Sequence, residues 1–246
     1  MNTTSIRIGV VGAGNNTRKH HIPKLQAISG VSVVSVANRS LASSQKVAEE
    51  FGIAKVYEHW QELVNADDTD AIVIGTWPNM HARITLAALE AGKHVMCEAR
   101  MASTFSEAKT MLEAAQAKPH LITQIVPSPF TLSVDTTVKR LLAEGFLGDI
   151  LAVEVTEKGA FIDKDSPLTW RQNADISGIN IMGLGIWYEA LMRWVGEATR
   201  VTAVGQTFVK MRPSPDGSEV HAVQIPDHLD VIAEMTCGAQ AHFGLS

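Results

Sequence analysis

Short apolar runs rich in β-branched residues alternate with longer stretches of helical periodicity through the first half of the chain. Uninterrupted apolar runs of this length are typical of parallel strands buried on both faces. We expect such strands at Ile6–Val11, Val31–Ala37, 71–75, His94–Cys97 and 121–126. We expect helices between them at 17–28, 43–50, 81–91 and 106–117. This alternation predicts a doubly wound α/β parallel sheet with right-handed crossovers.

The second half of the chain has a different pattern. Pro127-Ser128-Pro129 interrupts the alternation and predicts a boundary between domains at 1–127 and 128–246. Beyond it, we expect helices at 136–144 and 180–195, and strands at 150–156, 201–209, 220–224, 230–235 and 240–245. Many strands with few helices predict an α+β, mostly antiparallel open-sheet domain. Because the chain ends within the last run, we expect a shortened domain with 240–245 as an open edge.

Composition excludes several classes of function. Apolar residues make up 46% and charged residues 19% of the 246 positions, as in an ordinary soluble protein. The net charge of −5 and the lack of dense Lys/Arg runs argue against nucleic-acid or membrane partners. Cys97 and Cys237 have no metal-ligand spacing, so we expect no metal site and a reducing compartment. Without a leader pattern or a bilayer-spanning apolar stretch, a cytoplasmic location is expected.

The strongest chemical signal is a glycine-containing turn. Ile6–Val11 leads directly into Gly12-Ala13-Gly14-Asn15-Asn16-Thr17 and then into a helical pattern. In a dinucleotide site, the first glycine permits the turn and the second lets the backbone approach the pyrophosphate. The N–H groups at the start of the helix, around Asn15, Asn16 and Thr17, then face the phosphates. Thr17 replaces the third glycine, which predicts looser packing there; a tight turn without ligand is the alternative.

Asn38-Arg39-Ser40 follows the second strand, where NAD enzymes usually carry a carboxylate that binds the ribose. Asn38 removes the charge that would repel a 2′-phosphate, Arg39 can bind that phosphate, and Ser40 adds a hydroxyl donor. The segment therefore favours NADP over NAD. The alternative is a helix-capping Ser40 after a solvent-facing Arg39.

Further landmarks run along most of the chain. Thr76-Trp77-Pro78-Asn79-Met80-His81 follows the fourth main strand, and residues 87–102 read AALEAGKHVMCEARMA. Trp170-Arg171, Ser177-Gly178 and Arg193-Trp194 come later. Together with the nucleotide fingerprint, these segments resemble the Gfo/Idh/MocA oxidoreductases, the family of glucose–fructose oxidoreductase and inositol dehydrogenase.

The resemblance implies a Rossmann domain followed by an open-sheet domain, with a small-molecule substrate between them. Members of the family mostly oxidise or reduce sugars, cyclitols and related polyols with NAD or NADP. They pack sheet faces between subunits, so we expect a homodimer or larger homo-oligomer. By the same resemblance, Thr76, Trp77, His81 and Glu98 border the cofactor, and His81 more often supports the turn than acts in chemistry.

The chain departs from the family where proton transfer takes place. The family's Glu-Lys-Pro reads Glu98-Ala99-Arg100, so alanine stands at the lysine position. Alignment on Gly185 and Arg193-Trp194 puts Gly183 at the family's aspartate and Trp187 at its histidine. A register shift of one residue gives Leu184 and Tyr188 instead. Neither register supplies the Asp/His pair.

Five polar residues are candidates to replace the missing groups. Tyr188, Glu98 and Arg100 are the catalytic candidates, since a nearby cation can lower a tyrosine pKa and make it a proton donor. Arg171 and Glu189 are the substrate-binding candidates. The alternatives are a packed Tyr188 with a satisfied hydroxyl, a salt bridge for Arg100, and a solvated or Arg-paired Glu189. His20 or His21 can line the cofactor site, although adjacent histidines cannot share one metal.

Three functions fit these observations. The leading hypothesis is an NADP-dependent oxidoreductase that acts on a sugar, polyol or sugar-acid derivative through a non-standard proton relay. The second is a non-catalytic NADP-binding sensor or scaffold. The third is a redox-neutral enzyme with a retained nicotinamide.

Overall fold

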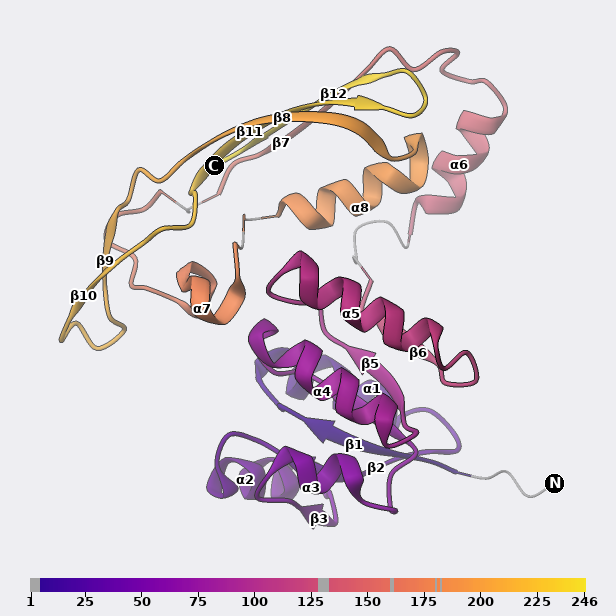
Figure 1. The fold of residues 1–246 in the computed structure, drawn as a ribbon, viewed down its shortest axis with the longest axis vertical. Helices are drawn as coiled ribbons and strands as arrows, with labels where there is room; N and C mark the ends of the chain where they lie inside the picture. Colours follow the sequence, from indigo (N-terminus) through magenta and orange to yellow (C-terminus); the bar gives the residue numbers. More distant parts are fainter. Residues whose placement is uncertain (1–4, 128–132, 160–161, 180, 182) are drawn as a thin grey trace. The chain divides into compact units, whose positions relative to one another are not determined.

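The computed structural model describes residues 5–127, 133–159, 162–179, 181 and 183–246 (Figure 1). The chain divides into two compact units. The first runs to Val126 and includes Ile176–Gly178, and the second comprises the other described residues. The division falls beside the predicted boundary at 127. Ser128 and Pro129, which belong to the motif that predicted this boundary, lie outside the described residues. No helix among the described residues is long and apolar enough to cross a membrane.

The first unit contains a six-stranded sheet in which all neighbouring strands are parallel. Its order is β3-β2-β1-β4-β5-β6, which confirms the predicted doubly wound fold. The strands are β1 (Ile6–Val11), β2 (Val31–Ala37), β3 (Lys55–Val56), β4 (Ala71–Ile74), β5 (His94–Cys97) and β6 (Thr123–Ile125). β3 was not predicted because its two residues are too short to form a pattern.

Helices of the first unit begin at recognisable caps. Thr104 and Glu107 form a capping box at the start of α5, and Ser40 caps α2 by accepting the N–H of Ser43. The helix expected at 17–28 is divided into the π-helical segment η1 and the short α1. The helices are η1 (Thr17–His21), α1 (Ile22–Gln26), α2 (Leu41–Phe51), α3 (Trp60–Asn65), α4 (Pro78–Glu90) and α5 (Phe105–Gln116).

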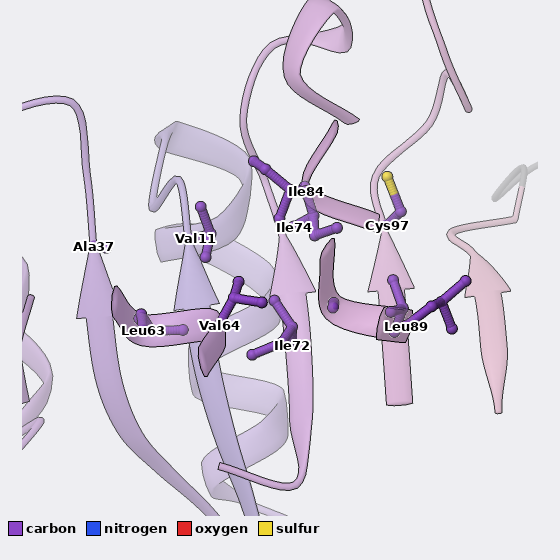
Figure 2. Packing of buried hydrophobic residues seen from close by; sticks show 11 residues of the cluster. Val11, Ala37, Leu63, Val64, Ile72, Ile74, Ile84, Leu89 and Cys97 are labelled. Carbon is purple, nitrogen blue, oxygen red and sulfur yellow. The ribbon is translucent and has the colours of Figure 1, made fainter. Parts of the chain in front are cut away.

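Apolar side chains bury both faces of this sheet. Ile72 and Ile74 of β4 pack with Leu63 of α3 and Leu89 of α4 (Figure 2). Val73, between them in sequence, joins the cluster on the other face, which includes residues of α1 and α2. Successive strand residues point to opposite faces, so burial of both faces requires an unbroken apolar run.

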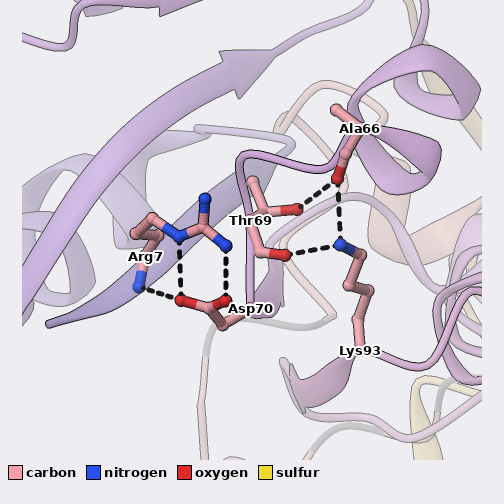
Figure 3. Close-up of polar contacts among 5 residues, drawn as sticks. All are labelled: Arg7, Ala66, Thr69, Asp70 and Lys93. Carbon is pink, nitrogen blue, oxygen red and sulfur yellow. Dashed lines mark hydrogen bonds and ion pairs between the residues drawn. The ribbon is translucent and has the colours of Figure 1, made fainter. Parts of the chain in front are cut away.

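Polar contacts secure the amino ends of these strands (Figure 3). The Arg7 guanidinium donates to both carboxylate oxygens of Asp70, at 3.1 and 2.7 Å. These hydrogen bonds lower the pKa of Asp70 to about 2. Lys93 Nζ donates to the carbonyls of Ala66 at 2.9 Å and Thr69 at 2.5 Å.

The second unit contains a four-stranded sheet in the order β7-β12-β11-β8 and a two-stranded hairpin of β9 and β10. Apart from the parallel β7–β12 pair, its strand pairs are antiparallel, as predicted. The strands are β7 (Ala152–Glu157), β8 (Ala198–Gln206), β9 (Met211–Pro213), β10 (Val220–Ala222), β11 (His228–Met235) and β12 (Gln240–Leu245).

The expectation that 240–245 forms an open edge is wrong. β12 lies between β7 and β11, because β7 pairs with it in parallel across a long sequence separation. β7 and β8 are the edge strands instead.

The helical segments of this part of the chain are α6 (Asp135–Ala143), η2 (Trp170–Gln172), α7 (Ala174–Ser177) and α8 (Leu184–Val195). α8 begins four residues later than the predicted 180–195, because Gly183 is its N-cap; Asn180 lies outside the described residues. Leu191 of α8 packs into the apolar cluster formed by β11 and β12.

Candidate functional site

The predicted glycine turn lies at the carboxyl edge of the first sheet, between β1 and η1. Gly12 has a φ of +85°, and a Cβ there would lie 2.6 Å from the backbone nitrogen of Thr76. Gly14 is exposed, and the nearest atom to a Cβ there would be 3.8 Å away. The first helical hydrogen bond runs from the Arg18 N–H to the Gly14 carbonyl at 2.9 Å. The preceding N–H groups have no helical acceptor, which suits them to bind an anion.

Thr17, at the position of the third fingerprint glycine, is buried with 1% exposure. The expected loose packing is not found, because Gly75 after β4 makes room for the threonine. A Cβ on Gly75 would lie 2.0 Å from Thr17 Oγ1 and 2.5 Å from the Gly12 carbonyl oxygen. Here the glycine of this contact stands at the strand end, at Gly75, and the larger residue stands in the helix. The two segments therefore pack closely.

The three residues after β2, Asn38, Arg39 and Ser40, make different kinds of contact. Asn38 Oδ1 accepts the Ala13 N–H at 2.6 Å, and Asn38 Nδ2 donates to Ser43 Oγ at 3.0 Å. Ser40 caps α2. The Arg39 guanidinium lies 5.7 Å from the centroid of the Trp77 ring, in cation–π geometry. Of the three predicted residues, Arg39 is therefore the one with an exposed charged group held in place.

Glu98 connects two loops of the carboxyl edge. Its carboxylate accepts hydrogen bonds from Asn16 Nδ2 and from His21 Nε2, and also from the Ala99 N–H at 3.1 Å. Burial raises the pKa of Glu98, but the bonds from His21 and Asn16 outweigh it, so the pKa falls below its usual range. An ionised carboxylate only accepts, so His21 Nε2 carries a hydrogen.

His81 joins two other segments of the same edge. The ring is 1% exposed, with Nδ1 2.8 Å from the Arg100 carbonyl oxygen and Nε2 3.0 Å from the Thr76 carbonyl oxygen. Both neighbours are acceptors, and a neutral ring donates to one of them. This geometry supports the turn-supporting alternative for His81.

The first unit fits a nicotinamide dinucleotide. Gly12 and Gly14 keep side chains away from the turn, the first N–H groups of the helix have no helical acceptor, and the cation of Arg39 follows Asn38, which contacts Ala13 of the turn. β1 and β4 are adjacent strands whose connections run in opposite directions, and dinucleotides bind above such a switch point.

The second unit contains the other predicted residues. The Tyr188 hydroxyl accepts the Ala198 N–H at 3.1 Å, and its ring contacts Phe243, which favours the packing alternative. Arg193 pairs with Asp135, whose hydrogen bonds and charge raise the pKa of Arg193; the charge of Glu189 adds a smaller contribution in the same direction. Arg171 is exposed and lies 4.5 Å from the Trp170 ring centroid.

Sequence reasoning did not identify two carboxylate contacts. The His21–Glu98 pair joins residues 77 positions apart, and no local pattern indicates it. In the second unit, Trp187 Nε1 donates to Glu157 Oε2 at 2.9 Å. The strand pattern around Glu157 does not indicate this contact. Among the described residues, no group of three or more His, Cys, Asp or Glu side chains is arranged to hold a metal ion.

Comparison with known proteins gives consistent matches to both units. Residues 6–124 match the GFO_IDH_MocA profile, described as an oxidoreductase family with an NAD-binding Rossmann fold. Residues 136–246 match the GFO/IDH/MocA C-terminal domain.

Individual relatives are similar over most of this chain. Levoglucosan dehydrogenase of Pseudarthrobacter phenanthrenivorans is 28% identical over 87% of the chain, which spans 57% of that protein's length. Inositol 2-dehydrogenase of Azotobacter vinelandii is 31% identical over 63% of the chain and 46% of its own length.

Solved structures show the same fold. The crystal structure of an oxidoreductase domain protein from Kribbella flavida has a TM-score of 0.86 and 25% identity, covering 99% of this chain and 67% of its own. Levoglucosan dehydrogenase in complex with NADH and L-sorbose has a TM-score of 0.84 and 24% identity, covering 98% and 66%.

Proposed function

Because the chain belongs to the GFO/IDH/MocA oxidoreductase family, we propose that it is a nicotinamide-dependent dehydrogenase of sugars, polyols or sugar acids that prefers NADP. The family and its NAD-binding Rossmann fold support the general activity. Relatives include dehydrogenases named for levoglucosan and inositol. The preference for NADP and the proton relay are specific to this proposal.

The observation that carries the cofactor proposal is Arg39 held over the ring of Trp77 beside the glycine turn. The guanidinium presents parallel N–H donors that match a phosphate. Asn38 contributes by leaving this position uncharged, since its amide is engaged with Ala13 and Ser43. One relative binds NADH, so the basis for NADP preference here is this chain's own Arg39.

In the proposed mechanism, the nicotinamide supplies the carbon that accepts or donates a hydride. The N–H groups that start η1 would hold the pyrophosphate, and Gly14 would allow its close approach. Asn16 and His21 fix the carboxylate of Glu98 at the end of β5. Thr76 and Trp77 follow β4 at the same edge of the sheet.

We propose that Glu98 and Arg100 take part in proton transfer, because Ala99 stands where the family has lysine. His21 Nε2 shares a hydrogen bond with Glu98 Oε1, so a proton can pass between a donor and an acceptor already in contact. Arg100 adds a permanent positive charge two residues later. Tyr188 is the weakest of the three catalytic candidates, because its ring packs against the apolar cluster of the second unit beside Phe243 and its hydroxyl oxygen accepts the Ala198 N–H.

The test is to purify the protein without added nucleotide and to identify any bound cofactor by mass spectrometry. NADP and NAD are then titrated into wild type, Arg39→Ala and the control Arg83→Ala, which removes an exposed arginine of α4. We expect Arg39→Ala to weaken NADP binding about 10- to 100-fold, the loss of one charge-assisted phosphate contact. NAD binding and the control should stay within about twofold; equal affinity of wild type for both cofactors would refute NADP preference.

A second candidate function is a non-catalytic NADP-binding protein. The engaged Tyr188 hydroxyl favours it, together with Ala99, Gly183 and Trp187 at the family's proton-handling positions. It predicts nucleotide binding without turnover on any polyol or carbonyl compound. A redox-neutral enzyme would instead turn over substrate while its co-purified nicotinamide is not consumed.

We also propose that the protein forms a homo-oligomer through the second unit's sheet. Val204 and Ile232 are 69% and 52% exposed. Val204 pairs with Asp230, so both apolar residues lie on the face opposite the core residues Leu229 and Val231. Val204 and Ile232 are diagonal neighbours in the β8–β11 ladder, and adjoining exposed apolar side chains form a surface suited to association.

A further inference from the structure

The end of β7 brings a carboxylate onto the start of α8. A Cβ on Gly183 would lie 2.1 Å from Glu157 Oε2 and 2.8 Å from Glu157 Cδ, so the carboxyl group lies directly over the glycine. Trp187, one turn into α8, donates its indole N–H to the same Oε2 at 2.9 Å. One carboxylate therefore lies against both of the α8 positions, Gly183 and Trp187, at which the chain departs from its family.

The sheet fixes the backbone that carries this carboxylate. The Glu157 carbonyl accepts the Ser246 N–H at 3.0 Å, and Glu157 pairs with Leu245 in the β7–β12 ladder. Alternation along β7 puts Val153, Val155 and Glu157 on the face that packs inward, and all three are partly buried. An apolar residue would continue this pattern, so a carboxylate here is a departure from simple packing.

The start of α8 also favours a negative charge. Gly183 is the N-cap of this 12-residue helix and supplies no side-chain cap. The Glu157 carboxylate lies beside it, where the helix dipole stabilises an anion. Among the described residues, no Lys, Arg or His side chain forms an ion pair with Glu157.

Resting on the proposed dehydrogenase function, we propose that Glu157 binds the substrate by accepting a hydrogen bond from a sugar or polyol hydroxyl group. Because Gly183 has no side chain, the Glu157 carboxylate occupies the space beside it. The acidic group therefore comes from β7 instead of from α8. The Trp187 indole can only donate and uses Oε2, which leaves Oε1 as the acceptor for a ligand. Hydroxyl groups are the donors that sugars and polyols offer in number.

The inference is tested with the full chain, NADP⁺ and two probes, levoglucosan and myo-inositol. Glu157→Gln retains the shape and the oxygen that faces Trp187 but removes the charge. Glu154→Gln is the matched control, because Glu154 is exposed on the opposite face of the same strand. Calorimetric titration gives the Kd of NADP⁺ first, and then the Kd of each probe at saturating NADP⁺.

We expect Glu157→Gln to weaken binding of at least one probe tenfold or more while the Kd of NADP⁺ stays within twofold. Glu154→Gln should change neither. A relocation variant, Glu157→Ala with Gly183→Asp, should bind the probe at least threefold better than Glu157→Ala alone. This variant returns the carboxylate to α8 and keeps the test valid if Glu157→Gln folds poorly.

Each contrary result has a distinct meaning. Probe binding by Glu157→Gln at wild-type strength, or equal losses in Glu154→Gln, overturns the role of Glu157. Wild type that binds NADP⁺ but neither probe also overturns it, and leaves the cofactor part of the proposed function standing. Wild type that binds no nucleotide overturns the proposed function itself.

Discussion

At the scale of single residues, the contact with Trp77 orients the guanidinium of the flexible Arg39 side chain. An arginine side chain has many rotamers, and an aromatic ring 5.7 Å from the guanidinium restricts them before ligand binds. We expect Trp77→Leu to weaken NADP binding about three- to tenfold, from the loss of about 1 kcal/mol of cation–π energy. Trp77→Phe should retain part of the affinity. Titration of NADP and NAD compares the variants; an equal loss for both cofactors would contradict a role through Arg39.

Asp70 gives a prediction about pH. Its hydrogen bonds with Arg7 lower its pKa to about 2 in the folded protein, against about 3.9 in an unfolded chain. A lowered pKa stabilises the fold above the unfolded value, and this stabilisation is lost as pH falls from about 4 to about 2. Because Asp70 and Arg7 are 38% and 42% exposed, solvent screening limits the effect to about 1 kcal/mol.

Urea unfolding of wild type and Asp70→Asn at pH 5 and pH 3 measures this contribution. The stability difference between the two proteins should be larger at pH 5 than at pH 3, and 1 M salt should reduce it. A difference that grows on acidification would contradict the assignment.

Local residue patterns predict only part of the candidate site. The glycine turn and Arg39 could be identified because each lies directly after a strand, where chain order dictates position. The pairing of His21 with Glu98 could not, since it depends on β1 and β5 both ending at the same edge of the folded sheet. For Ser40 and Tyr188 the sequence left a structural and a functional alternative open, and the contacts of their hydroxyl groups with Ser43 and Ala198 favour the structural one.

At the scale of elements, the contact between η1 and the end of β4 requires a glycine, Gly75, opposite the larger Thr17. Gly75→Ala places a methyl group against Thr17 and the Gly12 carbonyl, so we expect a loss of about 1–3 kcal/mol of unfolding free energy. Adding Thr17→Gly should recover only part of the loss, because the carbonyl contact remains. Chemical denaturation measures all three proteins.

Gly14→Ala is the matched control for this contact. A Cβ at Gly14 meets nothing closer than 3.8 Å, so stability should change by less than about 0.5 kcal/mol. The same methyl group faces the proposed pyrophosphate site and should weaken nucleotide binding. If Gly14→Ala were as destabilising as Gly75→Ala, the packing explanation would be wrong.

Element prediction succeeded where one segment determines its own structure. The five apolar runs predicted in the first half each contain a strand, because apolar and β-branched residues make up most of each run. The edge position expected for 240–245 was wrong, because strand order depends on a partner strand, β7, whose paired residues lie 88 positions earlier. Pairing over that distance leaves no trace in the alternation of β12 itself.

At the scale of the whole molecule, the chain spans 57% of the levoglucosan dehydrogenase that it resembles, so its assembly is argued from its own surface. Val204 and Ile232 lie on one face of the second sheet, and burying them against a second copy would remove two large apolar side chains from water. We expect light scattering after size-exclusion chromatography to give at least a dimer.

The combined variant Val204→Lys with Ile232→Lys should shift this assembly to monomer, because it places charges within an apolar contact. Val201→Lys is the matched control: Val201 is 65% exposed on the same strand, but it pairs with Ala233 and so lies on the other face. The control should keep the mass of wild type. Dissociation by Val201→Lys alone, or a monomeric wild type, would show that subunits do not associate through this face. Loss of the assembly in the combined variant, with nucleotide affinity unchanged, would assign association to the second unit and cofactor binding to the first.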